Sequence, residues 1–109
     1  MLFKVFALHV DLNEGIPLTS ELLDASLLAN TLHAITERVY LLNELHRVLR
    51  REGSVLFLEW ASSFNNMGPT EMQAVPPAEA VRLFRSSGFT TGPMLPAGTH
   101  HYAFVATKM

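Results

Sequence analysis

The chain has 109 residues, of which 49% are hydrophobic, and its formal net charge is −2. This length fits one small domain, and the apolar content is enough for a packed core. Four of the eight basic residues lie between Arg38 and Arg51, so there is no broad basic face, which argues against nucleic-acid binding. The absence of cysteine excludes disulfides and cysteine-based zinc sites. No apolar run approaches the ~20 residues that span a bilayer, so we expect a cytoplasmic protein without membrane contacts.

The first part of the chain predicts two strands separated by a turn region. Aromatic and β-branched residues predict a strand over residues 3–10. Asn, Gly and Pro within residues 11–17 are typical of turns, and residues 19–23 predict a single helical turn capped by a hydroxyl. Residues 25–29 are apolar; Ala and Leu also favour helices, but we interpret this run as a strand because a loop precedes it and a polar pair follows it.

The clearest pattern runs through residues 39–60. Helical spacing of apolar residues predicts an amphipathic helix whose buried stripe comprises Leu41, Leu42, Leu45, Val48 and Leu49. Thr36 is the expected N-cap of this helix, and Gly53 the expected left-handed C-terminal cap. The apolar run over residues 55–58 then predicts a parallel strand that is buried on both faces. A helix, a glycine turn and a buried strand form the second half of a βαβ unit.

The last part of the chain predicts a long loop, a helix and a hairpin. Residues 61–76 form an irregular segment, and loops of this length in small domains are often functional. Pro77 opens a predicted helix over residues 77–87, with Gly88 as its cap. We expect its buried stripe to contain Ala80, Val81 and Phe84, with Leu83 at the border. Residues 89–95 and 101–107 predict two antiparallel strands around a turn at 96–98.

Strands that alternate with helices predict an α/β domain whose sheet is parallel in its first part. Ligands of such sheets bind at the carboxyl ends of the strands. Here those ends are Asp11, residues 30–33, and the pair Glu59 and Trp60. Polar residues gather at all three, which predicts a ligand cleft at this edge.

Several segments resemble class I S-adenosylmethionine-dependent methyltransferases. That family has an acidic turn residue, a Leu-Pro, a Phe-Asp and a strand that ends near Asn-x-Leu-His; the counterparts here are Asp11, Ile16-Pro17, Leu23-Asp24 and residues 28–33. Residues 45–53 are similar to its Glu-x-x-Arg-Val-Leu-Lys-Pro-Gly-Gly element, and residues 58–60 and 101–105 also match. The resemblance covers nearly the whole chain and is greatest to the type-11 enzymes that act on small molecules, including the quinone-biosynthesis and arsenite branches.

The resemblance implies a truncated Rossmann-like methyltransferase sheet with a carboxyl-terminal antiparallel hairpin. The family's strand order is 3-2-1-4-5-7-6, and the match starts at about its third strand. The sequence has no glycine-rich cofactor loop, because its six glycines are isolated from one another. The acidic residue that holds the cofactor ribose in the family is also missing. We therefore expect this single partial domain, residues 1–109, to correspond to the carboxyl-terminal half of the family domain.

The resemblance also implies cofactor-binding residues. Asp11 matches the position that meets the adenine amino group, and the backbone amide of Leu12 follows it. The alternative for Asp11 is an Asx turn before Asn13. Asn30 matches the end of the fourth strand, beside the methionine part of the cofactor.

The resemblance implies three further site residues, of which His33 matches the end of the fourth strand beside Asn30, and Glu59 and Trp60 lie on the substrate side. His33 is the candidate catalytic residue, although histidines at such junctions are more often structural hydrogen-bonding groups. Glu59 and Trp60 end the next strand, where substrate lies in the family; Trp60 alternatively closes the core. The remaining histidines, His9 among them, form no His-x-x-x-His pair, so we expect no metal site.

The family reaction is methyl transfer from S-adenosylmethionine to a small-molecule acceptor. Without the glycine-rich loop, we expect this chain alone to bind the cofactor weakly or not at all and to be inactive. The alternative function is a non-catalytic methyltransferase remnant or subunit that acts through protein–protein contacts. Either way, we expect a homodimer or a completing partner chain, because the strand over residues 25–29 lacks the family's neighbouring strand and an open apolar edge recruits other strands.

Overall fold

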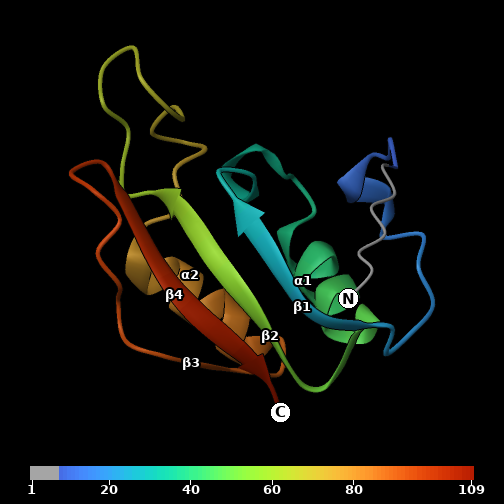
Figure 1. Ribbon diagram of the computed structural model, residues 1–109. Coiled ribbons are helices and arrows are strands. Elements are labelled where there is room, and N and C mark those ends of the chain that lie inside the picture. The colour runs from blue at the N-terminus through green and yellow to red at the C-terminus, as the bar shows by residue number, and fades with distance from the viewer. Residues whose placement is uncertain (1–7) are drawn as a thin grey trace, which may run out of the picture.

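The computed structural model describes residues 8–109 and contains one four-stranded sheet. The strands are β1 (Leu23–Ala29), β2 (Leu49–Trp60), β3 (Phe89–Thr91) and β4 (His101–Lys108). They lie in the order β1-β2-β4-β3 (Figure 1), with β1 parallel to β2 and the two pairs that involve β4 antiparallel. The parallel start and the closing hairpin are as the sequence predicts. The strand expected over residues 3–10 lies mostly outside the described residues, and residues 8–10 are not in a strand.

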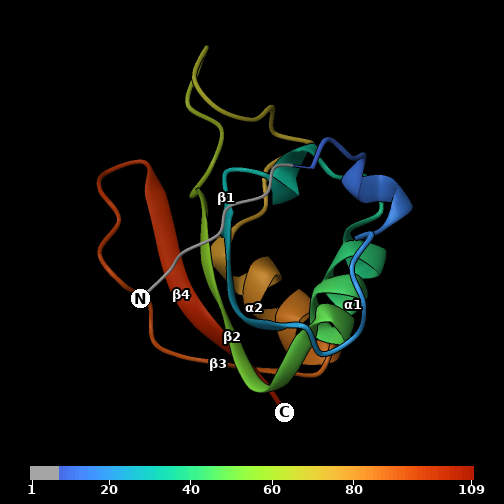
Figure 2. The ribbon, with the colours of Figure 1, turned by 45° about the vertical axis from the view of Figure 1, so that its right-hand side comes forward.

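Two helices connect the strands and cover the same face of the sheet. The α1 helix (Arg38–Val48) joins β1 to β2, and α2 (Pro77–Ser86) joins β2 to β3. Figure 2 shows both helices on one side of the sheet. Between sheet and helices lies an aromatic core in which Phe57, Phe84 and Phe104 contact one another, with ring centroids 5.0–5.4 Å apart. The predicted stripe of α1 is confirmed by the burial of Leu41, Leu42, Leu45 and Val48.

The end of α1 differs from the prediction. The helix ends at Val48, and Leu49 is already extended, with φ −79° and ψ 139°. Gly53 does not cap the helix; it lies inside β2, where an added Cβ would stand 2.8 Å from the carbonyl oxygen of Arg50 and 3.2 Å from that of Asp24. Glu52 has the positive φ, at 64°. The glycine is needed here for a close approach of two backbones.

The burial of β2 also differs from the prediction. Val55 and Phe57 are fully buried, but Leu56 between them is 43% exposed. Leu56 lies directly between Leu27 of β1 and Val105 of β4, which are 67% and 38% exposed. These three side chains form an apolar row on the face that neither helix covers. An apolar run predicts burial on both faces only when both faces have a covering layer.

Smaller differences occur at element ends. Residues 19–23 form no helix; a turn at Ser20 and Glu21 leads into β1, and Glu21 has φ 57°. Glu37, not Thr36, is the N-cap of α1. In α2 the buried residues are Ala80, Leu83 and Phe84, so Leu83 replaces Val81 in the stripe. The sequence locates both helices and the strands β1 and β4 to within a few residues, but not the start of β2, and it does not set which side chains face inward at the borders.

Replacing Leu45 by Ala should destabilise the domain. Leu45 is 6% exposed on α1 and belongs to the core, so the variant should lose roughly 2–5 kcal/mol through transfer and cavity terms. Val39→Ala is the matched control, since Val39 lies on the same helix and is 55% exposed. Thermal unfolding followed by circular dichroism should show a large loss for the first variant only. An unchanged midpoint for Leu45→Ala would contradict the burial of this helix face.

Stability should fall as the pH drops below about 6.5, because of His46. Burial, and next the charge of Lys108, lower the pKa of His46, partly offset by a hydrogen bond with the backbone of Gly88. A lowered folded-state pKa means that the unfolded chain binds the proton more readily, so acidification favours unfolding. Denaturant titrations at about pH 7.5 and about pH 5.5 should show this loss. His46→Gln, which cannot be protonated, should show a smaller loss; equal losses would contradict the assignment.

Candidate functional site

The carboxyl ends of β1 and β2 lie side by side, as parallel pairing requires. The amide of Asn30 donates to the carbonyl oxygen of Leu58 at 2.9 Å, which fixes the end of β1 against β2. Asn30 itself is exposed and has a left-handed backbone, with φ 52°. The chain then turns into a short 3-10 helix, η2 (Leu32–Ala34). A second 3-10 helix, η1 (Leu12–Glu14), lies toward the same end of the sheet (Figures 1 and 2).

Buried Glu59 and partly exposed His33 form a pair at this edge. Glu59 is 0% exposed, and its Oε2 lies 2.9 Å from Nδ1 of His33. The backbone amide of His33 donates to Oε1 at 3.0 Å, and that of Trp60 donates to Oε2 at 2.7 Å. A buried carboxylate is costly unless it is paired and hydrogen-bonded. Here the imidazole and the two amides supply that compensation, so Glu59 anchors η2 to the end of β2.

Tyr102 of β4 borders this pair. Its hydroxyl donates to the carbonyl oxygen of Val75 at 2.6 Å. Burial first, and the charge of Glu59 second, raise the pKa of Tyr102 well above its ordinary value. Tyr102 therefore stays neutral and closes the inner side of the site.

Arg38 fastens the long loop over residues 61–76 to η2. Its Nη2 donates to the carbonyl oxygen of Gln73 at 2.6 Å and to that of His33 at 3.1 Å. Its Nε donates to the carbonyl oxygens of Leu32 and Ile35 at 3.2 and 3.1 Å. The sequence does not reveal this role, because the acceptors are backbone groups and one of them lies 35 residues away.

A hollow of about 320 Å³ lies beside η2 and the loop over residues 61–76. It is open to solvent, and the loop over residues 61–76 forms one of its walls. The residues that line it are His33, Ala34, Ile35, Thr36, Arg38, Met72 and Gln73. The candidate catalytic histidine of the sequence analysis therefore borders a surface hollow.

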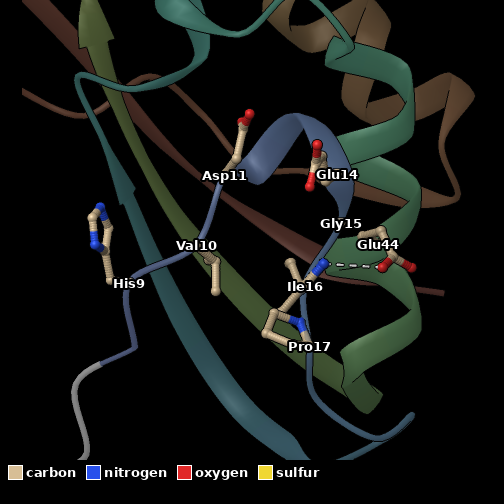
Figure 3. A pocket seen from close by; sticks show the side chains of 8 residues that line it. All are labelled: His9, Val10, Asp11, Glu14, Gly15, Ile16, Pro17 and Glu44. Carbon is tan, nitrogen blue, oxygen red and sulfur yellow. Dashed lines mark hydrogen bonds between the residues drawn. The ribbon is translucent and has the colours of Figure 1, made fainter.

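Asp11 caps η1 and lines a separate cavity of about 410 Å³ (Figure 3). Its Oδ1 accepts a hydrogen bond from the amide of Asn13 at 2.9 Å, the geometry of an Asx turn. Asp11 is exposed and Leu12 is half-buried against the core. Within residues 8–109, Oδ2 of Asp11 and the amide of Leu12 make no hydrogen bond. The turn thus uses one carboxylate oxygen and leaves the other oxygen and an adjacent donor available.

Asn13 connects this turn to the start of α1. Its Oδ1 accepts from the amide and the hydroxyl of Thr36 and from the amide of Glu37, each at 3.1 Å. This side chain therefore caps a helix that begins 25 residues later, which sequence reasoning missed. An Asn in a turn is a cap-type residue, but no local pattern indicates so distant a partner.

The segment after η1 is held by a charged pair on α1. The amide of Ile16 donates to Oε1 of Glu44 at 3.0 Å (Figure 3), and Arg47 donates to Oε2 of Glu44 at 2.6 Å. Arg47 also donates to the carbonyl oxygens of Ile16 and Leu18, at 2.7 and 2.8 Å. The hydrogen bond from Arg47 is the main reason that the pKa of Glu44 is lowered. These bonds fix the floor of the cavity beside Asp11.

Trp60 is half-buried and packs against its neighbours. Its ring centroid lies 4.2 Å from that of His101, and Gly68 approaches so closely that an added Cβ would stand 2.6 Å from the indole.

Among residues 8–109 no three His, Asp or Glu side chains gather closely enough to hold a metal ion. In the same range no helix is long and apolar enough to cross a membrane.

Comparison with known proteins identifies the fold. Residues 4–57 match the type-11 family model described as a methyltransferase domain. A solved S-adenosylmethionine-dependent methyltransferase from Aquifex aeolicus has a TM-score of 0.84 at 22% identity, covering 95% of this chain and 55% of that chain. No curated protein matches the chain.

Two further solved structures share the fold. The [4+2]-cyclase SpnF has a TM-score of 0.76 at 14% identity, covering 91% of this chain and 54% of its own. A protein from Sulfolobus solfataricus, provisionally assigned to the type 11 methyltransferases, has a TM-score of 0.72 at 20% identity. The match covers 85% of this chain and 54% of that protein. The chain therefore spans about half the length of these proteins. Residues 4–57 thus match the type-11 methyltransferase family, and the chain has the fold of class I S-adenosylmethionine-dependent methyltransferases over about half of their length.

Proposed function

We propose that this chain takes part in methyl transfer from S-adenosylmethionine to a small-molecule acceptor. The observation that supports this most is the meeting of Asn30, His33 and Glu59 at the carboxyl ends of the parallel strands β1 and β2, where ligands of such sheets bind. The sulfonium of the cofactor supplies an activated methyl group. The protein has mainly to align the acceptor with it and exclude competing water.

The residues around η1 fit the adenine end of that cofactor. A nucleobase edge with an amino group and a ring nitrogen needs one acceptor and one donor side by side. Oδ2 of Asp11 and the amide of Leu12 are such a pair, and neither is used within residues 8–109. In the proposal these two groups bind adenine. Asn30, exposed at the end of β1, faces the methionine part, and Trp60 borders the acceptor.

The remaining cofactor contacts have no counterpart in this sequence. It has no glycine-rich loop to approach the methionine end of the cofactor and no counterpart of the family's ribose-binding carboxylate. Binding by the adenine end alone should be weak, since a single pair of hydrogen bonds contributes little net free energy. The proposal therefore assigns catalysis to an assembly that includes the missing contacts, and only part of the binding to this chain.

Titration with S-adenosylhomocysteine should show weak binding centred on η1. We expect amide shifts at Leu12 and Asn30 in nuclear magnetic resonance spectra and little heat in calorimetry. Asp11→Asn keeps an oxygen for the Asx turn but replaces the free acceptor by a donor, so the shifts at Leu12 should vanish. Glu14→Ala is the control, because Glu14 lines the same cavity.

Two results would contradict these expectations. A complete absence of shifts at Leu12 and Asn30 at millimolar ligand would sink the proposed adenine site. A low-micromolar dissociation constant, which corresponds to about −8 kcal/mol, abolished by Asp11→Ala, would instead show that the chain binds the cofactor without the missing contacts.

A homodimer is part of the proposal. The row formed by Leu27, Leu56 and Val105 is apolar and exposed on the face opposite the helices, and β1 is an edge strand of the described sheet. Such a face favours association, most often with two-fold symmetry. A second copy brings the same apolar row, so the two faces are complementary.

We also propose a cytoplasmic location, which suits a chain without cysteine.

Light scattering at micromolar concentration should detect this dimer. Leu56→Lys places a charge in the middle of the row and should shift the mass toward that of the monomer. Val39→Lys is the control, because Val39 is similarly exposed but lies on α1. A monodisperse wild-type monomer near 12.1 kDa would sink the homodimer.

A further inference from the structure

The sequence resemblance implies that Glu59 contacts substrate, but the structure suggests a different use for it. Its carboxylate is 0% exposed, so it has no open surface toward a ligand. Its nearest side-chain partner is His33, which is 17% exposed and lines the hollow of about 320 Å³. Any effect of Glu59 on a molecule in that hollow must therefore pass through His33.

The contact with Glu59 selects one tautomer of His33. An ionised carboxylate only accepts hydrogen bonds, so Nδ1 must carry the proton that it shares with Oε2 at 2.9 Å. A neutral imidazole then has its lone pair on Nε2. Among residues 8–109, Nε2 has no hydrogen-bond partner, and it is not among the buried unpaired polar atoms. His33 therefore presents an unused acceptor atom to solvent.

The backbone of His33 is held at both its amide and its carbonyl group, and the ring is held by the contact of Nδ1 with Glu59. The amide of His33 donates to Oε1 of Glu59, and its carbonyl oxygen accepts from Arg38. Three ionisable groups lie near His33: Glu59 from β2, Arg38 from α1, and Tyr102 from β4, whose pKa is raised by burial and by Glu59. Of these, only Glu59 contacts the imidazole ring. A base oriented by a buried carboxylate is the arrangement by which proteins prepare a histidine to accept a proton.

We propose that His33, positioned by Glu59, accepts the proton of a methyl acceptor that carries a hydroxyl or amine group and binds in the adjoining hollow. This inference depends on the proposed methyl transfer. A lone pair on the acceptor oxygen or nitrogen forms the new bond to the methyl carbon. The carbon–sulfur bond breaks, and its electron pair stays on sulfur. The acceptor proton moves to Nε2 of His33, and Glu59 stabilises the imidazolium that results.

The hollow suits such an acceptor. Its lining combines the apolar residues Ile35 and Met72 with the polar residues Thr36 and Gln73. Gln73 belongs to the long loop, which Arg38 ties to His33 by two hydrogen bonds. His33 is therefore the catalytic residue of this proposal, and Glu59 is a positioning residue.

The chromogenic hydroxyl compound 4-nitrophenol provides a direct test that needs no cofactor. Its phenolate absorbs visible light, so proton transfer to His33 is seen as a gain of absorbance when protein is added at a pH below the pKa of the probe. We expect this gain with the wild-type chain and its loss in His33→Gln, which can still bond to Glu59. His9→Gln is the control, since His9 is exposed and lies in the other cavity.

A second measurement tests Glu59 separately. Long-range ¹H–¹⁵N spectra should show His33 protonated at Nδ1 in the free protein, and Glu59→Gln should reduce that preference together with the absorbance gain. If Glu59→Gln does not fold, the tautomer of His33 in the wild type and the absorbance of the His33→Gln variant still test the proposal. A His33 protonated at Nε2, or a phenolate signal that persists without His33, overturns the inference. Neither result depends on cofactor binding, so the proposed adenine site stands or falls independently.

Discussion

The parallel pairing of β1 with β2 is the constraint on which the site depends. Leu28 pairs with Phe57 and Ala29 with Leu58, so the two strands end at the same edge of the sheet. The next residues along each strand, Asn30 and Glu59, are therefore neighbours. At the other end, the chain passes from α1 directly into β2, and Gly53 lies where an added Cβ would stand 2.8 Å from the carbonyl oxygen of Arg50 and 3.2 Å from that of Asp24. The close backbone contact at one end of the pair and the polar groups at the other thus belong to the same two strands.

The buried charge of Glu59 shapes the edge in turn. A carboxylate with no exposed surface must find donors, and it finds two backbone amides and one imidazole. Both amides follow from the strand register and the η2 turn, so they are fixed by the backbone. The imidazole is the one side-chain donor among the three. The hydrogen bond between Nδ1 of His33 and Glu59 therefore has two consequences. It compensates the buried carboxylate, and it leaves Nε2 of His33 free.

Features that depend on local periodicity could be predicted from the sequence, and features that depend on distant neighbours could not. The stripe of α1 follows from spacing alone, and the closing hairpin follows from the alternation in β4. The exposure of Leu56 could not be foreseen, because it depends on both helices crossing on the same face. The roles of Asn13 and Arg38 could not be predicted for a similar reason: Asn13 bonds to Thr36 and Glu37, 23 and 24 residues away, and Arg38 reaches a backbone carbonyl 35 residues away. Glu59 was located correctly at a strand end, but its burial depends on η2 folding over it.

The fold alone leaves the chemistry open, since a [4+2]-cyclase shares it with methyltransferases. What distinguishes this chain is how its two candidate regions are joined. Asn13, in the turn that contains Asp11, bonds to Thr36 and Glu37, which lie three and four residues after His33. The same short connection between β1 and α1 therefore supports the proposed adenine contact on one side and the His33–Glu59 pair on the other. A cofactor held at Asp11 and an acceptor held at His33 would have their relative placement set by this one connection, which is what alignment for methyl transfer requires.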